Sequence, residues 1–140
     1  MKKTIKIANG QGFWGDSIDA PYNLVKYGDI DYLTLDYLAE VTLSIMQRQK
    51  LKKDDRGYAT DFIDLIKRII NDIVDKNIKV ITNAGGVNPK SCSNQLIQIA
   101  NNRGHELKIG IIEGDNIFND IDKFINNGVS FDNLETGESF

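Results

Sequence analysis

Short strand-like segments alternate along this chain with longer segments whose apolar residues recur at helical spacing. The strand-like segments are residues 4–8, 32–35, 78–82 and 107–112. Strands that are separated by helices need crossover connections, which produce a parallel sheet with helices on both faces. We therefore expect an α/β fold, namely a doubly wound, Rossmann-like three-layer sandwich around a four-stranded parallel sheet.

Proline, glycine and polar capping residues mark the helix boundaries between these strands. Pro21 suits a first helical turn, and Gly28 and Gly104 are typical stop signals. Thr60 and Asn88 are typical N-caps, and a proline follows Asn88. Together with the apolar periodicity, these signals predict a helix at residues 21–27 and one from residue 89 that is closed by Gly104. They also predict a helix that includes residues 38–46 and is followed by a charged connector at 50–57, one capped by Thr60 that includes residues 62–74, and one that includes residues 117–125 and stops at Gly128.

The simplest strand order for such a chain is 2-1-3-4, because the chain then winds one way to the second strand and crosses back for the third. Ligands of doubly wound sheets bind beyond the carboxyl ends of the strands, where the winding direction reverses. With this order the reversal lies between the first and third strands. The glycine-containing loops at residues 10–16 and 83–89 would then be neighbours.

Length and composition limit the possible functions. A chain of 140 residues fits one domain. Its 17 basic and 20 acidic side chains give a net charge of −3, and the basic run at residues 48–53 leads directly into Asp54 and Asp55, so we expect no nucleic-acid binding. The single Cys92 excludes an internal disulfide. No apolar run reaches the ~18 residues of a membrane span, so we expect a cytoplasmic protein.

The first glycine loop matches the G-x-G-x-x-G pattern at residues 10–15, and Asp36 stands about 20 residues further on, as in dinucleotide-binding folds. Two features oppose that interpretation. The bulky Phe13 and Trp14 occupy the part of the loop that should approach a pyrophosphate, and Asp16 would place negative charge beside it. Dinucleotide binding therefore stays an alternative, and a plain tight turn is another.

The second glycine loop joins a strand to the start of a helix. Glycines allow backbone N–H groups to face a ligand, and a helix N-terminus favours an anion such as a phosphate or a carboxylate. Gly85 and Gly86 therefore predict an anion site, with Asn83 and Asn88 beside it. The alternative is that these residues only give the turn its geometry.

Several carboxylates are expected at the same edge of the sheet and could act as general acids and bases or bind Mg²⁺. Their spacing matches no known metal-binding motif, so the metal stays unidentified. Cys92 lies in a first helical turn but is more typical of a small buried side chain than of a nucleophile. Because His105 is the only histidine and is expected at the opposite edge, a catalytic triad is excluded.

Five sequence blocks resemble the acyclic terpene utilisation (AtuA) family. They are IANGQGFWGD (7–16), DYL with DYLAEVT (31–33 and 36–42), GYATDF (57–62), TNAGGVNP (82–89) and EGD (113–115). The resemblance implies a role in the catabolism of citronellol-type and geraniol-type compounds through CoA thioesters. Family members are longer, so the chain resembles their amino-terminal domain, with residues 129–140 as a loosely attached tail.

The leading hypothesis is an enzyme domain that binds a carboxylate or an acyl-CoA-like anion in the crevice between the two glycine loops. The predicted catalytic residues are Asp16, Asp36 and Glu40. The predicted ligand contacts are Asn9, Gly10, Gly12, Gly15, Asn83, Gly85, Gly86, Asn88, Glu113 and Asp115. The alternatives are a non-catalytic assembly module and a dinucleotide-binding domain. The cofactor is unidentified, and the apolar residues of the tail predict a homo-oligomer.

Overall fold

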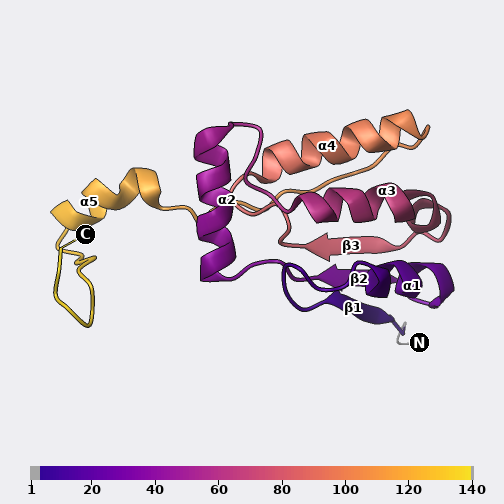
Figure 1. Ribbon diagram of the computed structural model, residues 1–140, viewed down its shortest axis with the longest axis horizontal. Coiled ribbons are helices and arrows are strands. Elements are labelled where there is room, and N and C mark those ends of the chain that lie inside the picture. The colour runs from indigo at the N-terminus through magenta and orange to yellow at the C-terminus, as the bar shows by residue number, and fades with distance from the viewer. Residues whose placement is uncertain (1–3, 140) are drawn as a thin grey trace.

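The computed structural model describes residues 4–139, in which three short strands and a set of helices alternate (Figure 1). The strands are β1 (Ile7–Gln11), β2 (Tyr32–Leu35) and β3 (Lys79–Thr82). The helices are α1 (Asp19–Tyr27), α2 (Glu40–Lys52), α3 (Thr60–Asp75), α4 (Pro89–Asn102), the 3₁₀ helix η1 (Phe118–Asp120) and α5 (Ile121–Asn126). The α/β class predicted from the alternating pattern is therefore confirmed.

The three strands form one parallel sheet in the order β1-β2-β3, with Ala8, Leu33 and Val80 in register across it. The predicted four-stranded sheet and its order 2-1-3-4 are both wrong. Both crossovers advance the sheet in the same direction, so β2 lies in the centre and the winding direction does not reverse among these strands. The loops after β1 and β3 consequently lie on either side of the end of β2 instead of next to each other.

Residues 107–112, predicted as the fourth strand, are extended but pair with no strand of the sheet. Leu107 packs against the core, whereas Ile112 is 97% exposed. Gly110 lies in the middle of the segment, where it adds chain entropy and no packing surface. The β-branched composition of this segment was therefore a misleading signal.

The helices cover only one face of the sheet, so the predicted three-layer arrangement is also wrong. Helix α1 packs on β1 and β2, α3 lies beside α1, and α4 packs on α3 (Figure 1). On the other side, which we call the open face, Ile7 is 67% exposed and Ile81 is 57% exposed. The remaining side chains of the open face follow from the strand alternation and are Asn9, Tyr32, Thr34 and Lys79.

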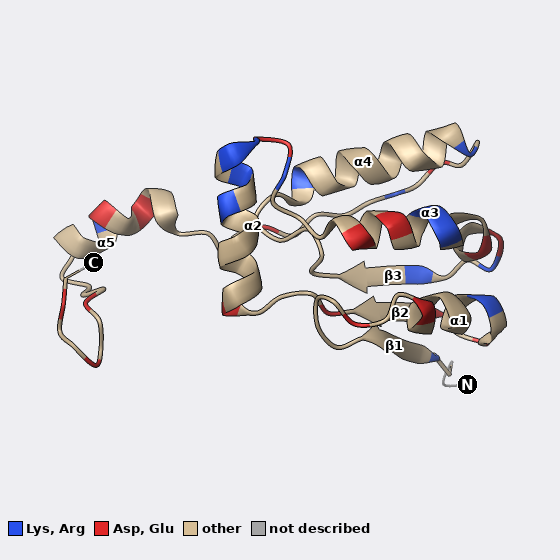
Figure 2. Cartoon of the chain, viewed as in Figure 1, with Lys and Arg blue, Asp and Glu red and all other residues tan. Residues whose placement is uncertain are grey.

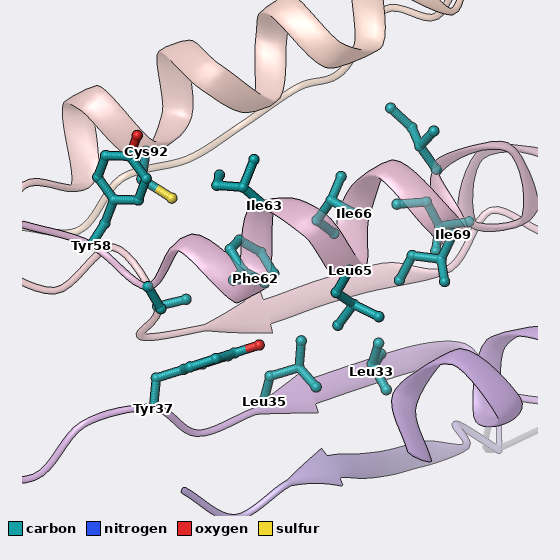
Figure 3. Close-up of a cluster of buried hydrophobic side chains, with 14 of the residues drawn as sticks. Leu33, Leu35, Tyr37, Tyr58, Phe62, Ile63, Leu65, Ile66, Ile69 and Cys92 are labelled. Atoms are coloured by element: carbon teal, nitrogen blue, oxygen red, sulfur yellow. The ribbon is translucent and has the colours of Figure 1, made fainter. Parts of the chain in front are cut away.

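Helix α3 provides most of the core. Phe62 and Leu65 of this helix face Leu33 and Leu35 of β2 (Figure 3). Ile63 points toward α4, where Cys92 and Tyr58 complete the cluster. The helix is apolar around much of its circumference because it packs against the sheet on one side and against α4 on another.

Local signals located several helix ends correctly. Helix α1 ends at Tyr27 with Gly28 as its C-cap, and the Asn88 side chain caps α4, which has Pro89 in its first turn. Helix α3 begins at Thr60, so its N-cap is Ala59 instead of the predicted Thr60. Helix α2 extends to Lys52, three residues into the expected charged connector at residues 50–57, because lysine and leucine favour helix even where apolar periodicity is absent.

Residues 113–139 stand away from the sheet on the far side of α2, and we call this segment the arm (Figure 1). Helix α5 continues directly from η1, and the ring of Phe124 contacts that of Phe131 edge to face at 6.4 Å. The loop that follows is closed by a hydrogen bond from the Asn133 amide to the Glu138 carbonyl. Phe140, at the end of the predicted tail, lies outside the described residues. Within residues 4–139, no helix has the length and apolarity needed to cross a membrane.

Candidate functional site

The first glycine loop is held in shape by its own side chains. The Asp16 carboxylate accepts hydrogen bonds from the Gly12 amide (3.2 Å) and the Ser17 amide (2.7 Å). The buried Gln11 side chain donates to the Asp16 carbonyl, and the Trp14 indole donates to Asp61 at the start of α3. Asp16, a predicted catalytic residue, therefore stabilises the turn.

The glycines of this loop differ in their surroundings. A Cβ atom on Gly10 would lie 2.8 Å from Pro21 Cβ and about as close to Leu35, so this glycine allows α1 to pack on the sheet. Gly12 has open space around it, and Gly15 has a φ of +101° in an exposed turn. Of the three predicted contacts, only Gly12 faces the space in which a ligand can lie.

The amides of the second glycine loop are largely engaged within the protein. The Gly86 amide donates to the Asn83 carbonyl at 3.1 Å, and the Val87 amide donates to the Gly57 carbonyl at 3.0 Å. The Asn88 amide donates to the Gly85 carbonyl, also at 3.0 Å. An anion cradle formed by these backbone groups would require these bonds to break first.

Asn88 and Gly86 fasten the second loop to the segment that precedes α3. The buried Asn88 side chain donates to the carbonyls of Asp54 and Arg56, each at 2.8 Å. A Cβ atom on Gly86 would collide with the sulfur of Met46, which is itself fully buried in α2. Both predicted ligand contacts therefore serve the packing of α2 and α4.

Asp36 and Asn83 form the polar centre of the candidate site. The Asn83 amide nitrogen donates to Asp36 Oδ1 at 2.8 Å, and its oxygen accepts from the Tyr37 backbone N–H at 2.8 Å. The hydrogen bond from Asn83 and a second one from the Leu38 amide hold the pKa of Asp36 below its usual value. Asp36 is therefore an ionised hydrogen-bond acceptor at neutral pH.

These two residues line an open pocket of about 470 Å³ at the carboxyl ends of all three strands. Its walls are Asn9, Gly12, Thr34, Leu35, Asp36, Ile81, Thr82 and Asn83. The volume lies within the range of about 300–1,000 Å³ that is typical of small-molecule sites. The structure thus brings four of the predicted site residues, Asn9, Gly12, Asp36 and Asn83, to one pocket, whose floor is β2 and not a gap between β1 and β3.

The pocket continues onto the open face and has no cation in its wall. Ile81 belongs to both surfaces, and Asn9 and Thr34 stand beside it in the same row of the sheet. The side-chain amide nitrogen of Asn9, once turned toward the carbonyls of Gln11 and Thr34, donates a hydrogen bond to each of them at 3.0 Å. Asp36 is the only charged residue among the lining residues. The pocket therefore combines neutral donors, one carboxylate and one exposed isoleucine.

The remaining predicted carboxylates lie outside this pocket. Glu40 is exposed at the first turn of α2, Glu113 pairs with Lys90 of α4 at 3.3 Å, and Asp115 is exposed in the arm. Within the described part of the chain, no three His, Cys, Asp or Glu side chains are close enough together to hold a metal ion. The carboxylates that were expected to gather at one edge are therefore dispersed.

The G-x-G-x-x-G loop does not have the backbone geometry that binds a dinucleotide. In that fingerprint the glycine turn leads directly into a helix whose N-terminus holds the pyrophosphate. Here Gly15 precedes the first residue of α1, Asp19, by four positions. Asp19 places a carboxylate in the first helical turn, where it pairs with Arg68 at 2.9 Å. The position that a pyrophosphate would occupy therefore already carries a negative charge.

Sequence reasoning missed four of the lining residues, namely Thr34, Leu35, Ile81 and Thr82. Thr34 and Ile81 face outward in their strands, which identifies them only once the open face is known. The signal available in the sequence was the alternation of β2, in which Thr34 lies between two leucines. A polar residue between buried leucines indicates that one side of the strand is not covered by apolar side chains.

Fold and site together define a parallel α/β protein with a ligand-sized pocket at the carboxyl ends of its strands. Comparison with protein families matches residues 5–140 to the family described as Acyclic terpene utilisation family protein AtuA. Because the match covers nearly all of the sequence, the chain belongs to the AtuA family. Comparisons with curated proteins and with solved structures found no match.

Proposed function

We propose that this AtuA-family chain is part of a catabolic enzyme and binds an acyclic terpenoid ligand, as the alcohol or the acyl-CoA thioester, in the pocket of Asp36 and Asn83. The observation that carries the proposal is the continuation of a polar pocket onto the open face, where the exposed Ile81 belongs to both surfaces. A branched apolar chain with one polar end matches that combination. Family membership supports a role in terpene utilisation only in general terms.

The polar end of the ligand would lie beside Asp36 and Asn83. A hydroxyl group can donate to the ionised Asp36, and a thioester carbonyl can accept from the neutral amide and hydroxyl groups of Asn9 and Thr34. A free carboxylate would face the Asp36 charge without a lysine or arginine among the lining residues. The geometry thus favours a neutral polar end over the free acid.

The apolar end of the ligand would cover the open face. Ile81 and Ile7 are more than half exposed, and burying such a side chain completely contributes about 1.5–3 kcal/mol. Lys79 is on the same face, with its ammonium 5.4 Å from the centre of the Tyr32 ring. It offers a cation for the phosphates of a CoA group, outside the pocket itself.

Asp36 would bind and orient the ligand and would not transfer a proton at neutral pH, since its lowered pKa makes it a weak base. Asp16 is engaged in the turn and Glu40 is outside the pocket wall. The other predicted acids thus have no role in this proposal.

Isothermal titration with citronellol, citronellic acid, citronellyl-CoA and CoA tests the proposal. We expect the alcohol or the thioester to bind, and Asp36→Ala and Ile81→Thr each to raise the dissociation constant about tenfold, the loss of roughly 1.4 kcal/mol. Asp75→Asn, at the far end of α3, is the matched control. Tightest binding of the free acid, or equal affinity in Asp36→Ala, would contradict the assignment.

A non-catalytic assembly module is the second candidate. It is favoured by Phe13, which is 62% exposed at the tip of the first glycine loop, beside the pocket. A thermal-shift screen of terpenoid alcohols, acyl-CoA thioesters, nucleotides and divalent ions distinguishes the two, because a ligand at 100 times its dissociation constant adds about 2.7 kcal/mol of stability. Stabilisation by none of these compounds would favour the module.

A further inference from the structure

One side of helix α2 faces away from the rest of the protein along its whole length. Met46 and Lys50 face the body: Met46 is fully buried, and the Lys50 ammonium donates to the Val87 carbonyl at 3.0 Å. Helix α2 otherwise stands across the end of the domain toward which the strands point (Figure 1). The side opposite Met46 is therefore uncovered.

That uncovered side carries an apolar half and a basic half. Val41, Ile45, Arg48 and Lys52 follow one another at intervals of four, three and four residues, so they form a single stripe along the helix. Val41 is 68% exposed and Ile45 is 40% exposed. Between residues 40 and 53 there are four basic side chains and one acidic one, and the basic ones gather at the end of the helix (Figure 2).

The arm has the complementary character. Residues 113–139 contain seven acidic side chains and one lysine, and Figure 2 shows acidic stretches along α5 and the loop that follows it. Phe118, Asp122 and Ile125 recur at helical spacing across η1 and α5. Phe118 is 71% exposed and Ile125 is 46% exposed. The apolar and acidic stripe of the arm is thus complementary to the apolar and basic stripe of α2.

We propose that the arm of one chain docks on the α2 stripe of a second copy, in a two-fold symmetric exchange. Within one chain the arm lies on the side of α2 away from the sheet, and Val41 and Ile45 of the stripe remain exposed (Figure 1). In a two-fold exchange each copy donates one arm and receives one, so both stripes are covered at once. The opposite charges select the partner surface and make the association sensitive to salt.

A charge exchange tests both the surfaces and the identity of the partner. The first variant is Arg48→Glu with Lys52→Glu, and the second is Asp122→Lys. Each variant alone places like charges at both contacts of its homodimer, so we expect its dimer dissociation constant to rise at least tenfold. A mixture of the two variants restores opposite charges at both contacts, and we expect it to dimerise as the wild type does.

Sedimentation velocity at low and high salt provides the measurement, and circular dichroism confirms that each variant is folded. Ile45→Ser and Phe118→Ser weaken the dimer without changing charge, whereas Ile97→Ser on α4 is the matched control on an unrelated surface. A wild-type chain that stays monomeric at high micromolar concentration overturns the proposal. So does a mixture of the two charge variants that fails to dimerise, because the arm would then cover its own α2 or another protein.

Discussion

Gly86 shows how one residue in a presumed binding loop can instead determine packing. Its φ of +52° is in the left-handed region, and a Cβ atom there would collide with Met46 Sδ and lie 2.8 Å from the Gly57 carbonyl oxygen. We expect Gly86→Ala to lower the free energy of unfolding by about 2–4 kcal/mol, through backbone strain and overpacking. Urea denaturation measures the change.

Gly110→Ala is the control for that substitution, because Gly110 has open space around its Cα and no positive φ. The free energy of unfolding of the Gly110→Ala variant should stay within about 0.5 kcal/mol of the wild-type value. If both substitutions have equally small effects, the contact of the second glycine loop with α2 does not contribute to stability.

Cys92 is the second prediction at the scale of single residues. The side chain is 4% exposed between α3 and α4, and burial raises the pKa of its thiol to about 11. Because the thiolate is the reactive form, we expect labelling by iodoacetamide to be slow at pH 8 and to accelerate as the pH approaches 11. In urea the same thiol should react at the rate of an ordinary cysteine. Equal rates in both states at pH 8 would contradict this expectation.

At the scale of elements, Asn88 connects α4 to the segment before α3. Its side-chain oxygen accepts from the Ser91 amide at 3.4 Å, and its nitrogen donates to the carbonyls of Asp54 and Arg56. We expect Asn88→Ala to lower the free energy of unfolding by about 2–4 kcal/mol, because it removes a helix cap and two partly buried hydrogen bonds to residues 54 and 56.

Asn88→Ser separates the two contributions to that loss. Serine can still cap α4 but is too short to reach both carbonyls, so an intermediate loss is expected in thermal unfolding monitored by circular dichroism. A serine variant as unstable as the alanine variant would assign the whole effect to the link with residues 54–56. One as stable as the wild type would show that this link contributes nothing.

At the scale of the whole molecule, the arm and the sheet are expected to be energetically independent within one chain. An ion pair between the exposed Glu113, at the beginning of the arm, and Lys90 of α4 joins the arm to the body, and an exposed pair contributes about 0–1 kcal/mol. A chain that ends at Ile112 should therefore unfold at the same urea concentration as the full chain. The comparison is made at protein concentrations too low for association. A markedly less stable truncated chain would show that the arm packs on its own body in solution.

Features that depend on neighbouring residues could be predicted from the sequence. The bounds of β2, the end of α1 at Gly28 and the capping of α4 by Asn88 follow from local conformational preferences and short-range hydrogen bonds. The same reasoning placed Asp36 at the end of β2 and Asn83 at the end of β3, and so identified the two polar residues at the centre of the pocket. The family resemblance also belongs here, since ordered blocks of sequence carry it.

Features that depend on contacts between distant segments could not be predicted from local sequence patterns. The strand order follows from the direction of both crossovers, which no residue of a strand encodes, and the segment around Gly110 lacks a strand to pair with despite its composition. Gly86 and Asn88 look like ligand contacts until Met46 and residues 54–56 are found against them. The open face exists because α1 and α3 pack on the same side of the sheet, a choice set by the balance of burial over the whole chain.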